Sequence, residues 1–142
     1  MKKYIIAAAA MLTAISVSAQ DYVSNRPAPE NRLFESQAVE NEIVKVSGLL
    51  TNRKLAWMFA NCFPNTLDTT VHFGKDEDGN WRTFVYTGDI HAMWLRDSGA
   101  QVWPYVRFAK EDEHLRNLRA GVIHCQFSLI CHAPYANAYK DG

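Results

Sequence analysis

The stretch SQAVENEIVKVSGLLTNRKLAWMFAN, residues 36–61, decides the fold class. Apolar residues recur in its first half at steps of three and four, the spacing of one helix face. These residues are Val39, Ile43, Val46 and Leu50. Gly48 and Asn52 predict a break, and a second helix is expected from Arg53 to Asn61. Two helices joined by a short turn form an αα-hairpin, the building block of helical barrels and toroids.

The segment that follows predicts a loop and then a β-hairpin. Pro64 ends the second helix because the residue before a proline is pushed out of the α region. Residues 65–70 are then expected to form a polar loop. Residues 70–73 and 81–87 are rich in β-branched and aromatic side chains. The turn-forming sequence KDEDGN separates them at residues 75–80, which is typical of a β-hairpin.

The last third of the chain returns to a helical pattern. Residues 94–109 are expected to be helical, with Pro104 kinking the helix or starting a new turn. The clearest helix runs from Glu111 to Cys131, and its acidic start suits the helix dipole. It must stop near Ala133, ahead of Pro134. Its apolar face comprises Leu115, Leu118, Val122, Cys125 or Gln126, and Leu129. The chain is therefore predicted to be mainly α with one small hairpin.

The first 19 residues have the pattern of a cleaved signal peptide. Two lysines precede an apolar run over residues 4–15, and small residues at 17–19 supply a cleavage site after Ala19. A membrane anchor is the alternative, but the run is shorter than the roughly 20 apolar residues that span a bilayer. We therefore expect an exported protein, periplasmic or secreted, without a membrane attachment after cleavage. Residues 20–35 show little periodicity and are expected to form an extended lead-in.

Composition narrows the classes of partner. The chain holds 15 basic and 15 acidic residues, and loss of the signal removes two of the lysines. No basic stripe remains, which argues against nucleic acid as a partner. A hydrophobic content of 48% with 12% aromatic residues suits a folded globular chain.

The three cysteines, Cys62, Cys125 and Cys131, cannot form a complete intramolecular disulfide set. Cys125 and Cys131 fall on one predicted helix about 9 Å apart along its axis, too far for a bridge. Buried free thiols are expected instead. Cys125 and Cys131, taken together with His124 and His132, do not match a zinc-binding pattern. The pair at 124–125 and the pair at 131–132 lie two helical turns apart. No metal site is expected.

The sequence TGDIHAMWLRDS, residues 87–98, gathers the side chains best suited to bind a sugar. A carboxylate such as Asp97 can accept hydrogen bonds from neighbouring hydroxyls, and Arg96 offers a planar fork of donors. Trp94 supplies a flat apolar face that can pack on a sugar ring. The alternative is purely structural: an Arg96–Asp97 ion pair, a helix N-cap at Asp97-Ser98, and Trp94 in the core.

Four sequence motifs together resemble the family 125 glycoside hydrolases. They are NCFPNTLDTTV at 61–71, TGDIHAMWLRDS at 87–98, QVWPY at 101–105 and PYANAY at 134–139. The resemblance covers about residues 26–139, and the two long motifs occur in the expected order. It implies an (α/α)₆ barrel several times larger than this chain, with short β insertions. The chain is therefore expected to be an N-terminal, truncated part of such a barrel and inactive alone.

The resemblance also implies an activity, the exo-acting hydrolysis of non-reducing α-1,6-linked mannose with inversion and without a metal or other cofactor. Arg96 and Asp97 correspond to the pair that binds mannose in the −1 subsite. Asp89, Trp94 and Asp68 fall in the same motifs and are expected to line or support that pocket. Inversion requires two carboxyl groups about 6.5–9.5 Å apart. In the family both come from segments C-terminal to this chain, so no residue here is assigned as acid or base.

Two positions depart from the family pattern. Ala133 stands where an aspartate usually precedes PYANA, and Gln126 stands near an expected arginine. The first departure puts the local geometry of Tyr135 and Asn137 in doubt. Two alternatives to the hydrolase therefore stay open, a mannose-binding module and an inactive fragment that lacks the general acid and base.

Overall fold

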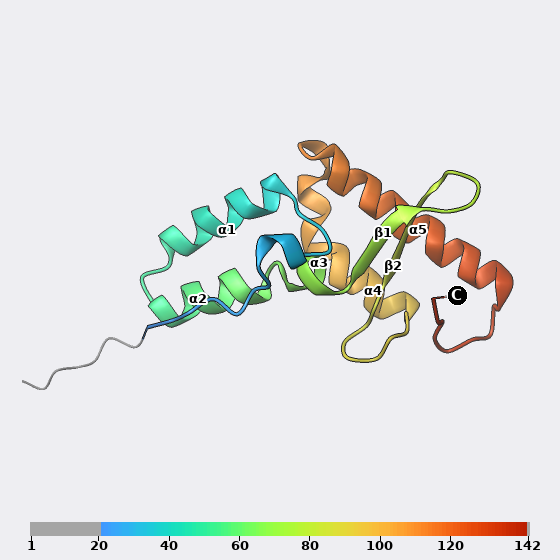
Figure 1. Ribbon diagram of the computed structural model, residues 1–142, viewed down its shortest axis with the longest axis horizontal. Helices are drawn as coiled ribbons and strands as arrows, with labels where there is room; N and C mark the ends of the chain where they lie inside the picture. The colour runs from blue at the N-terminus through green and yellow to red at the C-terminus, as the bar shows by residue number, and fades with distance from the viewer. Residues whose placement is uncertain (1–20, 142) are drawn as a thin grey trace, which may run out of the picture.

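The structure, a computed structural model, describes residues 21–141, so the expected signal peptide at 1–19 lies outside the described residues. The described chain is mainly helical, with one antiparallel two-stranded sheet, which confirms the predicted fold class (Figure 1). None of its helices has the length and apolar character needed to cross a membrane. The elements, in order, are the 3₁₀ helix η1 (Pro29–Asn31), α1 (Gln37–Leu49), α2 (Arg53–Cys62), α3 (Asn65–Thr69), β1 (Val71–Lys75), β2 (Trp81–Val85), α4 (Leu95–Val102), the 3₁₀ helix η2 (Trp103–Lys110) and α5 (Glu113–His132).

Helices α1 and α2 form the predicted αα-hairpin, which lies at one end of the molecule in Figure 1. Side-chain caps define where each helix begins, as is usual for serine and asparagine. Ser36 Oγ accepts a hydrogen bond from the Val39 amide at 3.3 Å. Asn52 Oδ1 accepts one from the Leu55 amide at 3.1 Å. The expected break at Asn52 is thus the start of α2, whereas Gly48 lies inside α1.

Residues 65–69 form the short helix α3, so the predicted polar loop is wrong. The hydroxyl groups of Thr69 and Thr70 donate to the carbonyls one turn earlier, at 2.7 and 2.8 Å. Leu67 is buried, and the Asp68 carbonyl accepts a hydrogen bond from the Leu33 amide at 3.0 Å. Tertiary contacts therefore stabilise a five-residue helix that has no apolar periodicity of its own.

The predicted hairpin is present, with Val71 opposite Val85 and Lys75 opposite Trp81. The hairpin crosses α5 (Figure 1), and the Thr83 hydroxyl donates to the Leu118 carbonyl at 2.8 Å. Asp112 caps α5 by accepting from the Leu115 amide at 2.9 Å, so the helix begins two residues later than expected. It ends at His132, as predicted. Its buried face comprises Leu115, Leu118, Gly121, Val122 and Cys125.

One hydrophobic core joins the hairpin, α5 and η2. Pro104 lies in the first turn of η2, so the helical path changes from α to 3₁₀ at the predicted position. Tyr105 is buried in this core, and its hydroxyl donates to the Phe63 carbonyl at 2.5 Å. The three cysteines are free thiols. Cys125 is buried, but Cys62 and Cys131 sit in the last turns of α2 and α5 and are exposed, so the expected burial is wrong for both.

Candidate functional site

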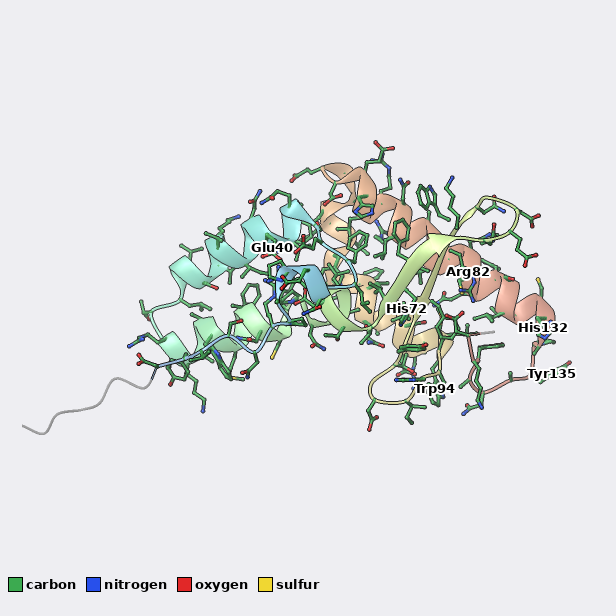
Figure 2. All side chains as sticks on the ribbon, in the orientation of Figure 1. Glu40, His72, Arg82, Trp94, His132 and Tyr135 are labelled. Atoms are coloured by element: carbon green, nitrogen blue, oxygen red, sulfur yellow. The ribbon has the colours of Figure 1, made fainter. Side chains whose placement is uncertain are left out.

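An open hollow of about 630 Å³ lies at the N-terminal end of α4. The loop between β2 and α4 forms one side of it, and the first two turns of α4 form the other. Figure 2 shows Trp94 beside this loop, on the far side of β1 and β2 from the α1–α2 hairpin. The structure brings together three of the five predicted sugar-binding residues here. The lining comprises Thr87, Gly88, Ile90, Trp94, Arg96, Asp97, Ala100 and Gln101.

The loop that leads into the hollow is a tight, hydrogen-bonded turn. The Thr87 amide and hydroxyl both donate to the Ala92 carbonyl at 3.0 Å. Gly88 has a φ of +82°, in the left-handed region that glycine adopts without a steric cost. The turn therefore depends on Gly88 to bring the chain back toward α4.

A second segment, residues 133–139, is hydrogen-bonded to the end of the loop between β2 and α4. Met93 and Tyr139 exchange two backbone hydrogen bonds of 2.8 and 3.0 Å, and both side chains are buried. The Tyr139 hydroxyl donates to the Ala133 carbonyl at 2.9 Å. Ala133, which stands where the family pattern has an aspartate, thus contributes its backbone carbonyl to this contact. Tyr135 and Asn137 are exposed on the intervening segment, and Figure 2 shows Tyr135 at its outer edge.

Arg96 and Asp97 lie next to each other on the rim of the hollow. Arg96 Nη2 is 3.3 Å from both carboxylate oxygens of Asp97, and the two side chains are 88% and 42% exposed. Because solvent screens such a pair, it contributes little to stability. The predicted N-cap alternative is wrong, since Trp94 occupies the N-cap position and Asp97 lies in the first turn. Trp94 is only partly buried and faces the hollow, so it is not a core residue.

Asp89 and Asp68 lie outside the lining of this hollow. Asp89 is exposed on the loop. Asp68 is 2% exposed, and Arg26 donates to its carboxylate from Nε and Nη2 at 2.7 and 3.0 Å. Asp68 therefore does not line this hollow with Arg96, because Arg26 occupies its carboxylate, and the expected supporting role of Asp68 stays a prediction. A sugar-binding role for Asp89 stays a prediction.

The same guanidinium joins Asp68 to α1. Arg26 also donates to Glu40 at 2.9 and 2.5 Å. The hydrogen bonds from Arg26 hold the pKa of Glu40 below its ordinary value, and the two carboxylates raise the pKa of Arg26. Arg26 precedes Asp68 by 42 residues, and no local pattern in the sequence connects them. This cluster fastens the N-terminal lead-in to α1 and α3.

Sequence reasoning gave no role at the site to three polar residues that lie at or behind the hollow. Thr87 and Gln101 line it and lie inside the recognised motifs, so their positions were a usable signal. Gln101 donates to the Tyr86 carbonyl at 3.3 Å. Gln126, from α5, contacts the first turn of α4 without any signal in the local sequence. Over residues 21–141, no group of three or more His, Cys, Asp or Glu side chains could hold a metal ion.

The comparisons with known proteins agree on one family. A sequence model described as metal-independent alpha-mannosidase (GH125) matches residues 52–142. The meiotically up-regulated gene 157 protein of Schizosaccharomyces pombe is 44% identical over 115 residues, which cover 81% of this chain and 23% of the yeast protein.

A solved structure is also similar, that of a metal-independent α-mannosidase of Streptococcus pneumoniae in a non-productive complex with α-1,6-mannobiose. It superposes with a TM-score of 0.67 at 39% identity over 78% of this chain and 25% of that protein. The chain thus spans about a quarter of the length of each of these relatives. Because the family match extends over more than half of the chain and includes the hollow, the chain belongs to the metal-independent α-mannosidases of family GH125.

Proposed function

We propose that this chain forms part of the −1 subsite of an exo-acting α-mannosidase that hydrolyses non-reducing terminal α-1,6-linked mannose with inversion. The observation that carries the proposal is the convergence of Trp94, Arg96 and Asp97 on one open hollow. Membership of the α-mannosidase family supports it, as does the α-1,6-mannobiose bound by the similar pneumococcal enzyme. The substrate is a mannose-containing oligosaccharide.

Each of the three side chains has a distinct role toward a terminal sugar. The Asp97 carboxylate accepts hydrogen bonds from two neighbouring hydroxyls, and Arg96 donates to hydroxyl oxygens. Trp94 offers its ring to the C–H face of the pyranose. Arg96 and Asp97 contact each other at 3.3 Å and are accessible, so a sugar can reach them without breaking a buried contact.

The acid and base of the reaction are assigned to other parts of the protein. Among the residues that line the hollow, Asp97 is the only carboxylate. An inverting reaction needs two carboxyl groups about 6.5–9.5 Å apart on opposite sides of the scissile bond. We therefore give Asp97 a binding role and place both catalytic carboxyl groups outside residues 21–141.

The expected signal peptide at residues 1–19 makes export part of the proposal, to the periplasm or the medium. Export is tested by N-terminal sequencing of the protein recovered from the periplasm and the medium. A mature protein beginning at Gln20 is expected, and an intact Met1 would contradict export by this route.

The activity is tested on the purified full-length gene product with α-1,6-mannobiose as substrate. Time-resolved ¹H NMR should show β-mannose first and then its mutarotation, because inversion at an α-linkage releases the β-anomer. Hydrolysis should persist in EDTA. Release of α-mannose would contradict inversion, and the absence of turnover with intact binding would contradict the hydrolase.

A second candidate function is a mannose-binding module without hydrolysis. It is favoured by the single carboxylate in an otherwise open hollow. Isothermal titration with mannose and α-1,6-mannobiose distinguishes the two functions when it is run beside the NMR assay. Binding without turnover indicates the module, and neither binding nor turnover indicates an inactive fragment.

A further inference from the structure

A side chain from α5 holds the first turn of α4 through a closed set of three hydrogen bonds. Gln126 Nε2 donates to the Leu95 carbonyl at 2.9 Å and to Ser98 Oγ at 2.9 Å. Ser98 Oγ in turn donates to the Leu95 carbonyl at 3.1 Å. The amide nitrogen of a glutamine carries two hydrogens, so it can make both bonds at once.

This contact is buried at its centre. Ser98 is completely buried, and Gln126 is partly buried on α5. Hydrogen bonds in such a position are shielded from water and fix geometry more firmly than exposed ones. The three bonds therefore tie α4 to α5 at one defined place.

Helix geometry relates this tie to the hollow. Leu95 and Ser98 are three residues apart and lie on the same face of α4, toward α5. Arg96 and Asp97 fall between them and project toward the opposite side, onto the rim of the hollow. A rotation of the first turn about the helix axis would move the guanidinium and the carboxylate together.

The first turn of α4 has no cap of its own. Trp94 occupies the N-cap position and makes no side-chain capping hydrogen bond. A helix start without a cap frays readily, since its first amide groups lack partners within the helix. The contact with Gln126 replaces the missing local restraint by a tertiary one.

The geometry points to Gln126 as a positioning residue for the sugar-binding pair, which holds the first turn of α4 at the rotation that presents Arg96 and Asp97 to the hollow. This inference rests on the proposed function for the identity of the ligand. The tie between α4 and α5 can nevertheless be measured without any sugar, so the two claims can fail separately.

The test compares Gln126→Met with wild type in the full-length gene product. Methionine keeps the length of the side chain and loses both donors. Gln37→Met is the matched control, because Gln37 is exposed on α1 and its side chain donates to Asn41, one turn along the same helix. Amide hydrogen exchange is followed at Ser98, whose amide donates to the Trp94 carbonyl at 2.9 Å. Affinity for α-1,6-mannobiose is followed as KM where the protein hydrolyses it and by titration calorimetry where it does not, in both cases well below the Tm.

Gln126→Met should exchange the Ser98 amide about tenfold faster and bind α-1,6-mannobiose about tenfold more weakly, because both hydrogen bonds of the Gln126 amide are lost. Exchange elsewhere in α5 and the behaviour of Gln37→Met should match wild type. A lower Tm with unchanged Ser98 exchange and unchanged affinity would show a merely structural role and overturn the inference.

Two further results keep the inference and the proposed function apart. If wild type itself does not bind α-1,6-mannobiose, the proposed function fails, and the exchange rate of Ser98 alone decides the positioning role. If Gln126→Met does not fold, Ser98→Ala takes its place, because it removes the two bonds of the Ser98 hydroxyl and leaves Gln126 bound to the Leu95 carbonyl. Ser98→Ala should then weaken binding about threefold, and unchanged affinity would overturn the inference.

Discussion

Gly121 on α5 and Thr83 on β2 lie so close together that a Cβ added at Gly121 would be 2.5 Å from the Thr83 hydroxyl oxygen. The backbone of β2 lies just behind it, at 3.0 Å from the same Cβ position. The hairpin therefore packs on α5 at a distance that only glycine permits.

Replacing Gly121 by alanine should destabilise the protein by about 1–3 kcal/mol, the usual cost of forcing extra atoms into a packed contact. Urea unfolding followed by circular dichroism measures the change. Gly48→Ala is the matched control, since a Cβ there meets nothing within 4 Å and lies in a helix. The control should gain up to about 1 kcal/mol from helix propensity. Equal effects of both substitutions would contradict the close approach.

Removing the Asp97 carboxylate should abolish most binding of α-1,6-mannobiose and most activity of the full-length protein. The fold should survive, because Asp97 is not a cap and its contact with Arg96 is exposed. The loss of a favourable charge in the first turn of α4 costs about 0.3–1 kcal/mol at most. Asp97→Ala is compared with Asp78→Ala, an exposed change in the hairpin turn. Unfolding of Asp97→Ala would point to a structural role for the carboxylate.

The Glu40–Arg26 contact predicts a specific dependence of stability on pH. Hydrogen bonds from Arg26 lower the pKa of Glu40 in the folded state, below its ordinary value of 4.5. The contact thus stabilises the fold above pH 4.5, and that contribution is lost as the pH falls through the folded-state pKa.

The Tm of Glu40→Gln should therefore lie below that of wild type at pH 7, and the gap should narrow as the pH falls below 4.5. Glu77→Gln, at an exposed site in the hairpin turn, should show no such convergence. A Tm difference between the two proteins that stays constant from pH 7 to pH 3 would mean that the ionised Glu40 carboxylate contributes nothing to stability.

The burial of Tyr105 predicts a second dependence of stability on pH, at alkaline pH. Burial raises its pKa to about 12, and its hydroxyl donates to the Phe63 carbonyl. Because the folded-state pKa exceeds the ordinary value of 10, the stabilisation is complete below pH 10 and is lost as the pH rises toward 12. Tyr105→Phe should lose about 1 kcal/mol at pH 8 through the missing hydrogen bond. Between pH 9 and pH 11.5 its Tm should fall less than that of wild type. Tyr135→Phe, at an exposed position, should follow wild type throughout.

The three thiols should differ in reactivity, two of them reacting quickly and one slowly. Cys62 and Cys131 are exposed, whereas Cys125 is buried and burial raises its pKa. Since the thiolate is the reactive form, an aromatic disulfide reagent should modify two thiols quickly and the third only on unfolding. Cys125→Ser should leave the fast phase unchanged. Three equally fast thiols would contradict the packing of α5 on the hairpin.

The sequence predicted most of the fold because its signals were local. Ser36, Asn52 and Asp112 each cap a helix start, and the apolar spacing from Leu115 to Val122 identified the buried face of α5. Helix α3 was missed because five polar-rich residues carry no periodicity. The burial of Leu67 and the threonine hydroxyl groups decide its conformation instead.

At the candidate site, too, local motifs predicted some residues, whereas only the tertiary fold brings the others together. Trp94, Arg96 and Asp97 lie within four consecutive residues, so the motif that identified them also placed them together. Asp68 belongs to another motif, and its partner Arg26 comes from a lead-in that has no pattern at all. Gln126 reaches the site from a separate helix. Contacts between residues that lie far apart in the sequence cannot be predicted from the local spacing of residue types.

The paired backbone of Met93 and Tyr139 sets an order of events during synthesis. The ribosome completes the segment that bears Trp94, Arg96 and Asp97 some forty codons before the strand partner of Met93 emerges. Until residue 139 is free to pair, the amide and carbonyl of Met93 lack these two partners. The loop that borders the hollow therefore reaches its final shape only after residue 139 has been made, although it is encoded some forty codons earlier.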